Sequence, residues 1–252
     1  KGRYTEAELY LSTALSMIKN IEAIDASIIA EYMNTLAEVY HDQRKFKEAA
    51  QFYTEALAIW ENLFGEVDAT VAGCLNNLGL LAYDQDEYEQ AAILHQRALA
   101  IRKQVFGLEH EETAQSMAHL AQVYQNQGQY EEAEELLLQS LHIRERVLNP
   151  EHPSLAFSLH CVGNLYYECG KYMLAEQYMR RSLAVAERAF DSYHPTLAGT
   201  IEFLAGILID NQQYVEAEAL CLQALKIRET NKTDGNSLVN SLNYLGKLYF
   251  RQ

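Results

Sequence analysis

The sequence predicts an all-α protein, an α-solenoid of stacked helix pairs, and three observations support this. Of the 252 residues 49% are hydrophobic, yet only 3 prolines and 12 glycines are available for the many turns of an all-β fold. The stretch from Gly128 to Asn149 places apolar residues on one side and charged residues on the other, as an amphipathic helix does. Its first aromatic residue, Tyr130, recurs every 42 residues.

This recurring stretch, called helix B here, has a fixed internal pattern. An alanine stands three residues after each aromatic residue, and a leucine preceded by a small residue stands eight residues further on. Small residues at fixed helical offsets allow a neighbouring helix to approach closely. The aromatic positions are Tyr4, Phe46, Tyr88, Tyr130, Tyr172 and Tyr214, and the alanines are Ala7, Ala49, Ala91, Ala133, Ala175 and Ala217.

A second amphipathic segment, called helix A, lies between successive copies of helix B. A large apolar residue followed by alanine or glycine marks it, again at a spacing of 42 residues. Each repeat is therefore a helix A followed by a helix B. The marker pairs are Leu36-Ala37, Leu78-Gly79, Leu120-Ala121, Val162-Gly163 and Leu204-Ala205.

The connection from each helix B to the next helix A also repeats. One position holds residue types that accept a left-handed turn after a helix, namely Gly65, Gly107, Asn149 and Asp191. The position just before the next helix holds Asp68, His110, His152 and His194, followed twice by proline, at Pro153 and Pro195. We interpret the histidines as turn or capping residues, because no second ligand type recurs beside them, and we expect no metal site.

The repeats predict a single solenoid over residues 1–252. Helix B of a truncated repeat is expected at 1–22, five full repeats at 28–64, 70–106, 112–148, 154–190 and 196–230, and helix A of a truncated repeat at 237–252. Both ends would expose apolar faces that terminal caps normally cover. We therefore expect a piece of a longer array that can associate with itself through its uncapped ends.

Charge and composition narrow the classes of partner. The net charge of −15 argues against nucleic acid and anionic lipid, which are bound through basic patches. No apolar run approaches the roughly 20 residues that span a bilayer, and the first residues do not resemble a signal peptide, so we expect a cytoplasmic protein without membrane insertion. The cysteines lie in apolar helical segments without a CxxC pair and are expected to be buried, reduced thiols: Cys74, Cys161, Cys169 and Cys221.

These residues resemble the tetratricopeptide repeat (TPR). Leu120-Ala121 with Tyr124, followed by Tyr130, Ala133 and Ser140, matches its pattern, and the 42-residue period with ALAIRKQVFG and EHPSLAFSL is similar to the kinesin light chain class. The resemblance covers the whole chain. It implies a right-handed superhelix of antiparallel helix pairs, with helix A lining a concave face. Such repeats serve as scaffolds in many unrelated proteins.

If helix A lines a concave groove, positions flanking its small residue project into that groove. Asparagine amides there suit the backbone of an extended peptide, and aromatic residues supply apolar anchors. Acidic residues, among them Glu31, Asp42 and Glu168, predominate nearby. The predicted groove residues are Asn34, Glu38, His41, Asn76, Leu80, Tyr83, Gln122, Gln125, His160, Asn164, Tyr167, Glu202, Ile209, Asn243, Lys247 and Phe250.

The sequence indicates a binding protein without catalysis or cofactor. It contains no GxxxxGK or HExxH pattern, nucleophile elbow or paired catalytic carboxylates. We expect the acidic, aromatic-lined groove to bind a basic or amphipathic peptide or protein segment, from another protein or from the same chain. The alternative is a sensor or regulatory arm of a larger signalling enzyme, an ATPase or a caspase-like protease, that binds in cis.

Overall fold

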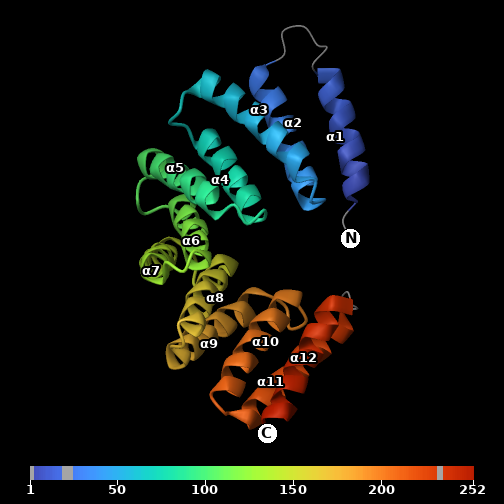
Figure 1. Cartoon of the computed structure of the whole chain (residues 1–252), viewed down its shortest axis with the longest axis vertical. Coiled ribbons are helices and arrows are strands. Elements are labelled where there is room, and N and C mark those ends of the chain that lie inside the picture. Colours follow the sequence, from blue (N-terminus) through green and yellow to red (C-terminus); the bar gives the residue numbers. More distant parts are fainter. Residues whose placement is uncertain (1–2, 19–24, 232–234) are drawn as a thin grey trace. The chain divides into compact units, whose positions relative to one another are not determined.

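The computed structural model describes residues 3–18, 25–231 and 235–252, and every regular element in this part of the chain is a helix (Figure 1). The predicted all-α solenoid is confirmed. The helices are α1 (Tyr4–Ile18), α2 (Ala26–Asp42), α3 (Phe46–Phe64), α4 (Ala69–Tyr83), α5 (Tyr88–Phe106), α6 (Glu111–Asn126), α7 (Tyr130–Val147), α8 (Pro153–Glu168), α9 (Tyr172–Ala189), α10 (Pro195–Asp210), α11 (Tyr214–Thr230) and α12 (Gly235–Arg251).

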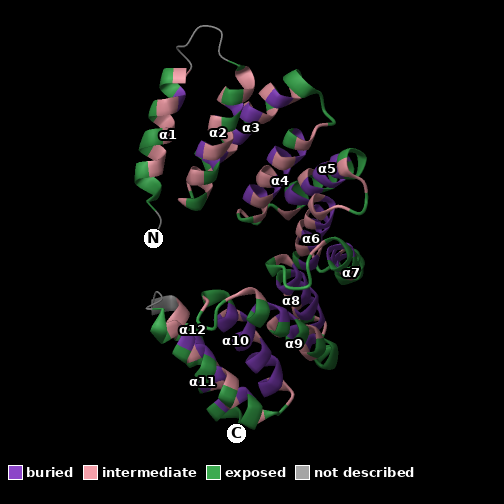
Figure 2. Ribbon diagram, turned by 180° about the vertical axis from the view of Figure 1, so that it is seen from behind, coloured by how far each residue is buried: buried purple, intermediate pink, exposed green. Residues whose placement is uncertain are grey.

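The chain divides into two compact units, which are described separately. Unit 1 comprises residues 1–129 and unit 2 comprises residues 130–252. In each unit the main contacts join helices that follow one another in the sequence, such as α2 with α3, α4 with α5, α8 with α9 and α10 with α11. Each helix buries one side against its neighbours and exposes the other (Figure 2). This is the stacking of helix pairs that the 42-residue period predicts.

The odd-numbered helices are the predicted B helices, and each begins at the predicted aromatic residue. The alanine three residues later faces the core. From α3 to α11 it is fully buried: Ala49, Ala91, Ala133, Ala175 and Ala217 are all 0% exposed. This burial agrees with the prediction that small residues at these positions allow a neighbouring helix to approach closely.

The small position of helix A makes the opposing contact. A Cβ atom added at Gly79 of α4 would lie 2.7 Å from the imidazole ring of His95 on α5. At Gly163 of α8 it would lie 3.0 Å from Cε of Met179 on α9. Both contacts join residues 16 positions apart, so helices A and B of one repeat meet at the same place in each unit.

Every turn from helix A to helix B contains one residue with positive φ, two positions before the aromatic residue. These are Arg44 (59°), Asp86 (62°), Gly128 (76°), Gly170 (71°) and Gln212 (62°). The next residue donates its backbone N–H to a carbonyl near the end of helix A, for example Lys171 to Tyr166 at 2.8 Å and Gln213 to Leu208 at 2.8 Å. This left-handed C-terminal cap satisfies carbonyls that the helix leaves open.

The connections from helix B to the next helix A confirm the capping prediction. Nδ1 of His110, His152 and His194 accepts a hydrogen bond from the backbone N–H two residues later, at 3.2, 3.2 and 3.3 Å. Asp68 makes the same bond through its carboxylate, at 2.7 Å to Thr70. Among the described residues no cluster of His, Cys, Asp or Glu could hold a metal ion.

One expectation about these connections is wrong. Gly65 and Gly107 adopt positive φ, at 84° each, but Asn149 and Asp191 do not. Their side chains instead accept the backbone N–H two residues on, from Glu151 and Tyr193 at 3.0 Å each. Asparagine and aspartate can close a turn in this way, so a left-handed backbone is not required.

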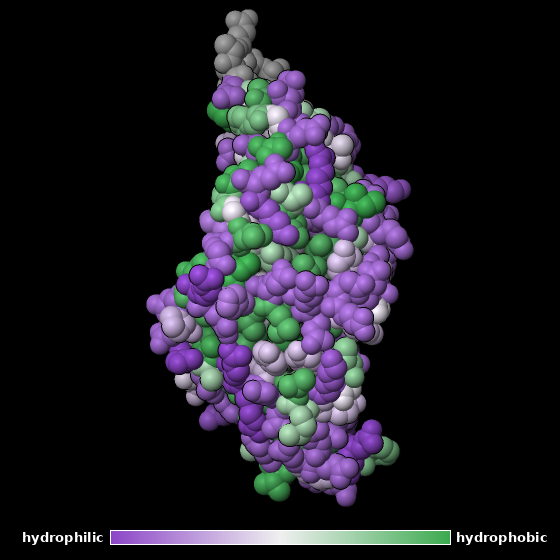
Figure 3. Space-filling model, turned by 90° about the vertical axis from the view of Figure 1, so that its left-hand side faces the viewer, coloured by the Kyte–Doolittle hydropathy of each residue, from purple (hydrophilic) through white to green (hydrophobic). Residues whose placement is uncertain are grey.

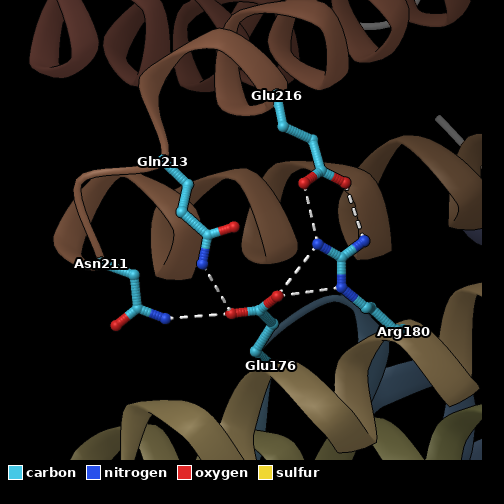
Figure 4. Close-up of polar contacts among 5 residues, drawn as sticks. All are labelled: Glu176, Arg180, Asn211, Gln213 and Glu216. Atoms are coloured by element: carbon cyan, nitrogen blue, oxygen red, sulfur yellow. Dashed lines mark hydrogen bonds and ion pairs between the residues drawn. The ribbon is translucent and has the colours of Figure 1, made fainter.

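Polar side chains also join neighbouring B helices. In unit 2, Glu176 of α9 accepts hydrogen bonds from Asn211 and Gln213, at 3.1 Å each, in the turn that leads to α11 (Figure 4). Arg180 links Glu176 to Glu216 of α11, with a shortest contact of 2.7 Å to Glu216. The hydrogen bonds and charge of Arg180 lower the pKa of Glu216. Glu134 with Lys171 and Glu8 with Lys45 make contacts at the spacing of Glu176 with Gln213, which is 37 residues.

The cysteines are free thiols, as predicted. Cys74, Cys161 and Cys221 are buried, while Cys169 is only half-buried, because it lies in the turn after α8. Burial raises the pKa of the Cys74 and Cys161 thiols to about 12, so both stay protonated at neutral pH. None of the described helices has the length and apolar character needed to cross a membrane.

The left-handed turns give a first prediction. Gln212→Gly should raise the free energy of unfolding by about 0.5–1 kcal/mol, because a side chain at positive φ meets the backbone and glycine does not. Gly170→Ala, at the equivalent turn, should lower it by about 1 kcal/mol. Urea denaturation of both variants measures the difference. The assigned turn is contradicted if Gln212→Gly lowers and Gly170→Ala raises the free energy of unfolding, or if both variants change it equally.

The buried imidazole of His95 gives a second prediction. Burial, together with the charge of Arg102, lowers its pKa to about 4, and Nδ1 has no partner among the described residues. Between pH 6.5 and 4 the unfolded chain binds a proton at this residue that the folded chain does not. The free energy of unfolding should therefore fall as the pH falls, with about 2 kcal/mol of the loss between pH 7 and pH 5 coming from His95.

Denaturation of the His95→Leu variant at both pH values isolates this contribution. The variant should lose less stability on acidification than the wild type, because residue 95 then no longer titrates. His142→Leu is the control, since it replaces an exposed histidine of α7. If the free energy of unfolding of His95→Leu depends on pH as that of the wild type does, the loss of stability does not come from His95.

Candidate binding surface

The predicted groove residues lie on the even-numbered helices, where many of them contact the next A helix of the same unit. We call these side chains of α2, α4 and α6 in unit 1, and of α8, α10 and α12 in unit 2, the A-helix face. Several of these contacts join residues 43 positions apart, one more than the repeat length. Examples are Asn34 with Asn77, His41 with Asp84, and Tyr167 with Asp210.

In unit 1 the first such contact centres on Glu38. Its carboxylate accepts hydrogen bonds from the amides of Asn34, at 2.8 Å, and Asn77, at 3.2 Å. Nδ2 of Asn77 also donates to the side-chain oxygen Oδ1 of Asn34 at 3.4 Å. These bonds tie α2 to α4 and hold the carboxylate of Glu38, which is itself exposed.

One turn further along, aromatic and charged side chains continue the same face. His41 of α2 lies 2.9 Å from the carboxylate of Asp84, after α4. Asn126 of α6 donates a hydrogen bond to the hydroxyl of Tyr83 at 2.7 Å. Tyr83 is half-buried, and its ring meets that of Tyr88 edge to face, with the ring centroids 5.6 Å apart.

A cavity of about 370 Å³ opens among these helices in unit 1. Asn34, Asn76, Asn77 and Gln115 contribute four side-chain amides to its lining. Oδ1 of Asn76 is bound to Nδ1 of His119 at 2.7 Å, and Oε1 of Gln115 accepts from Arg102 at 3.2 Å. The amide nitrogens of Asn76 and Gln115 have no partner among the described residues, so they can donate hydrogen bonds to a ligand.

Arg102 of α5 forms the buried side of this cavity and is 5% exposed. It donates to the backbone oxygen of Glu112 at 3.0 Å and to Oγ of Ser116 at 2.9 Å, and it pairs with the carboxylate of Glu112 at 2.6 Å. Burial lowers the pKa of Arg102, and the charge of Glu112 partly offsets this. Sequence inspection missed this residue, because an arginine within an amphipathic stretch is usually solvated.

In unit 2 the A-helix face is organised around Asp210, the last residue of α10. The hydroxyl of Tyr167 donates to its carboxylate at 2.6 Å, and Nζ of Lys247 donates at 3.0 Å. Burial alone would raise the pKa of Asp210, but these two hydrogen bonds and the charge of Lys247 outweigh burial and lower it. Burial and the bond to Asp210 raise the pKa of Tyr167.

An aromatic group lies beside this network. The ring centroid of Phe203 on α10 is 5.1 Å from that of His160 and 5.4 Å from that of Tyr167, both on α8. Burial lowers the pKa of His160, so its ring is neutral at neutral pH. Asn164 donates to the carboxylate of Glu168 at 3.1 Å, one turn along α8.

Four predicted groove residues are buried. Asn76, at 5% exposure, lines the cavity of unit 1, and the other three act in the core of the repeats. Ile209 is 1% exposed and Gln125 is 9% exposed. Glu202, at 5% exposure, pairs with Arg228 at 3.0 Å and accepts a hydrogen bond from Ser241. Glu202 therefore does not contribute an accessible negative charge, because a helix B arginine neutralises it.

The other predicted residues keep partial or full exposure. Leu80 and Gln122 are half-buried, Asn243 is exposed, and Phe250 is 88% exposed. In the face drawn in Figure 3, hydrophilic residues cover most of the surface, with apolar residues in small groups between them. The sequence did not identify Asp84, His119, Asn126 or Asp210 as partners of the predicted residues. The signal that locates them is the spacing of 43 residues.

Comparisons with known proteins agree with this architecture. Models of the tetratricopeptide repeat match residues 1–62, 70–146 and 115–168, and a second model with the same description matches 156–196 and 197–230. No curated protein matches the chain in sequence.

Several solved structures share the fold. BtubC (BKLC) from P. vanneervenii is 21% identical, with a TM-score of 0.78 over 93% of this chain and 94% of that one. The repeats of a putative kinesin light chain from Podosopora anserina are 25% identical, with a TM-score of 0.69 over 85% of this chain and 100% of that one. A Rap protein complexed with Competence and Sporulation Factor is 17% identical, with a TM-score of 0.69 over 93% and 69%.

The repeat length, the small residues at the helix contacts and the matched family models lead to one conclusion. Helices A and B recur with the pattern that the models describe, over nearly all of the chain. The chain belongs to the tetratricopeptide repeat family.

Proposed function

We propose that this chain is a non-catalytic, cytoplasmic scaffold that holds an extended segment of a partner protein on its A-helix face. The observation that carries the proposal is the cavity of about 370 Å³ in unit 1, in which four side-chain amides converge. Amides can donate to and accept from the backbone of a peptide whatever its sequence, and two of these four have free N–H groups.

Charge selects the class of segment. Exposed carboxylates on or near the A-helix face are Glu31, Glu38, Asp42, Asp84 and Glu168. A basic or amphipathic segment complements them, whereas an acidic segment is repelled. Tyr83, Tyr167 and Phe250 supply apolar anchors in this proposal, and Gln122, Asn164 and Asn243 supply further polar contacts.

A regulatory arm of a larger protein is the second candidate, and the similar structures favour it. One is a Rap protein complexed with Competence and Sporulation Factor, and another is the quorum sensor NprR from B. thuringiensis, with a TM-score of 0.70 at 20% identity over 99% of this chain and 64% of that one. In this candidate the A-helix face binds a segment of the same chain. An added peptide would then compete with that segment. The apparent affinity for the peptide would be lower when the segment is covalently linked to the A-helix face than when it is absent.

Self-association is a further part of the proposal. Large apolar side chains are exposed on the outermost described helices, including Tyr10 on α1 at 72% and Phe250 on α12 at 88%. Contact between such faces in two copies would bury them, as stacking buries the faces of inner repeats. Light scattering over a range of protein concentrations measures it, and a constant monomer mass would exclude it at those concentrations.

The binding proposal gives a third prediction. Glu38→Lys should weaken binding of a labelled amphipathic peptide with alternating Lys and Leu by about fivefold or more, because it reverses an exposed charge on the A-helix face. Fluorescence anisotropy measures the affinity. The affinity should also fall from low to high salt, since exposed charges are screened.

The control is Glu89→Lys, which makes the same charge reversal on the exposed side of α5, a helix B. It should leave the affinity nearly unchanged. Melting curves of both variants show whether either change disturbs folding, which matters for Glu38 because two asparagines bind it. Equal loss in both variants, or salt-independent binding, would contradict the proposal.

A further inference from the structure

A second cavity, of about 270 Å³, lies in unit 2 among α7, α8 and α9. It is separate from the A-helix face, because none of the predicted groove residues lines it. Leu155 and Leu159 of α8 and Val185 of α9 form its floor, and Glu145, Arg181 and Arg188 stand around them. The B helices α7 and α9 are consecutive B helices of the array, and α8 packs against both.

The floor of this cavity is apolar. Leu155, Leu159 and Val185 are 5%, 2% and 8% exposed, so most of each side chain already packs in the core. An apolar group that enters the cavity covers the remainder and loses its own contact with water. This removal of apolar surface from water favours binding.

The charges beside the floor are unequal. Glu145 pairs with Arg181 at 2.5 Å, which neutralises both. Arg188 is exposed and donates through Nε to the backbone oxygen of Ala184 at 3.1 Å. Its two terminal nitrogens have no partner among the described residues, so Arg188 can make a bidentate bond to a carboxylate.

Unit 1 contains the same framework two repeats earlier. Arg97 pairs with Glu61 at 2.6 Å, as Arg181 pairs with Glu145. Leu75 and Ile101 stand at the positions of Leu159 and Val185. The positions of Pro150 and Arg188, however, hold Glu66 and Gln104. The net formal charge of the positions around the cavity is −1 in unit 1, from Glu61, Glu66 and Arg97. It is +1 in unit 2, from Glu145, Arg181 and Arg188, although the net charge of the whole chain is −15.

We propose that the cavity of unit 2 binds an apolar acid, which is a short aliphatic or aromatic stem ending in a carboxylate. The stem contacts Leu155, Leu159 and Val185, and the carboxylate pairs with Arg188. The volume is below the range of about 300–1,000 Å³ that is usual for whole small-molecule ligands, so the cavity takes a small acid or an end group. The two sources of this chemistry are a free short-chain carboxylic acid and the carboxy-terminal residue of a partner chain.

The test titrates the whole chain with two acids and their neutral counterparts, followed by ¹H–¹⁵N NMR. N-acetyl-leucine represents a carboxy-terminal residue and hexanoate represents a free acid, and the amides of both remove the charge. Both acids should shift signals from α8 and α9, and the amides should bind about tenfold more weakly or not at all. The tighter of the two acids identifies the source.

The deciding variant is Arg188→Gln, which places at residue 188 the side chain that unit 1 carries at Gln104. It should weaken binding of the acids by about tenfold and leave the amides unaffected. Lys226→Gln is the control, since it removes an exposed positive charge on α11 outside the cavity. Ala184→Leu should abolish binding of acids and amides alike, because Ala184 lines the cavity.

Three outcomes would overturn the proposal: no binding of either acid, equal binding of acids and amides, or unchanged affinity in Arg188→Gln. Arg188 is exposed, so this variant stays informative even if Ala184→Leu fails to fold. The proposal is independent of binding at the A-helix face. Glu38→Lys should leave the affinity for N-acetyl-leucine unchanged, and Arg188→Gln should leave the affinity for the basic peptide unchanged.

Discussion

The close approach of helices A and B at positions with little or no side chain is the constraint on which the rest of the structure depends. Five alanines of the B helices are completely buried, and a Cβ atom added at Gly79 or Gly163 of the A helices would lie 2.7 or 3.0 Å from a side chain of the paired helix B. Because the helices pack closely at these positions, the helix pairs keep one geometry from repeat to repeat. The same positions on successive A helices therefore lie side by side within each unit.

This regular placement turns single side chains into continuous surfaces. Polar side chains of one repeat meet partners 43 residues later in the chain, as in Asn34 with Asn77 and Tyr167 with Asp210. Such bonds hold the side chains in place, so these side chains lose less conformational entropy if a ligand binds them. In the proposed function, many of the groups that stabilise the stack would also contact the bound segment.

Differences between equivalent positions give each unit its own chemistry. Both units carry an ion pair between consecutive B helices, Arg97 with Glu61 and Arg181 with Glu145. Two differences, Pro150 in place of Glu66 and Arg188 in place of Gln104, change the sign of the net charge at these positions from negative in unit 1 to positive in unit 2. A repeat protein can therefore change the charge of one repeat by a few substitutions, because the framework around each position is already built.

The sequence by itself determined the fold class, the helix pairs, the buried alanines and the histidine caps. Each depends on local spacing: 3.6 residues per turn within a helix, and 42 residues between repeats. The left-handed turns at Arg44, Asp86 and Gln212 were not predicted, because these residue types do not indicate a positive φ as glycine does.

Only the tertiary structure decided which candidate site residues are accessible. Glu202 and Ile209 share the spacing of the exposed groove residues, but they are buried, Glu202 against Arg228 of a helix B. Likewise, Arg102 looks like a solvated residue in the sequence and lines a cavity in the structure. Burial and pairing depend on residues brought from other helices, and periodicity within one helix does not contain that information.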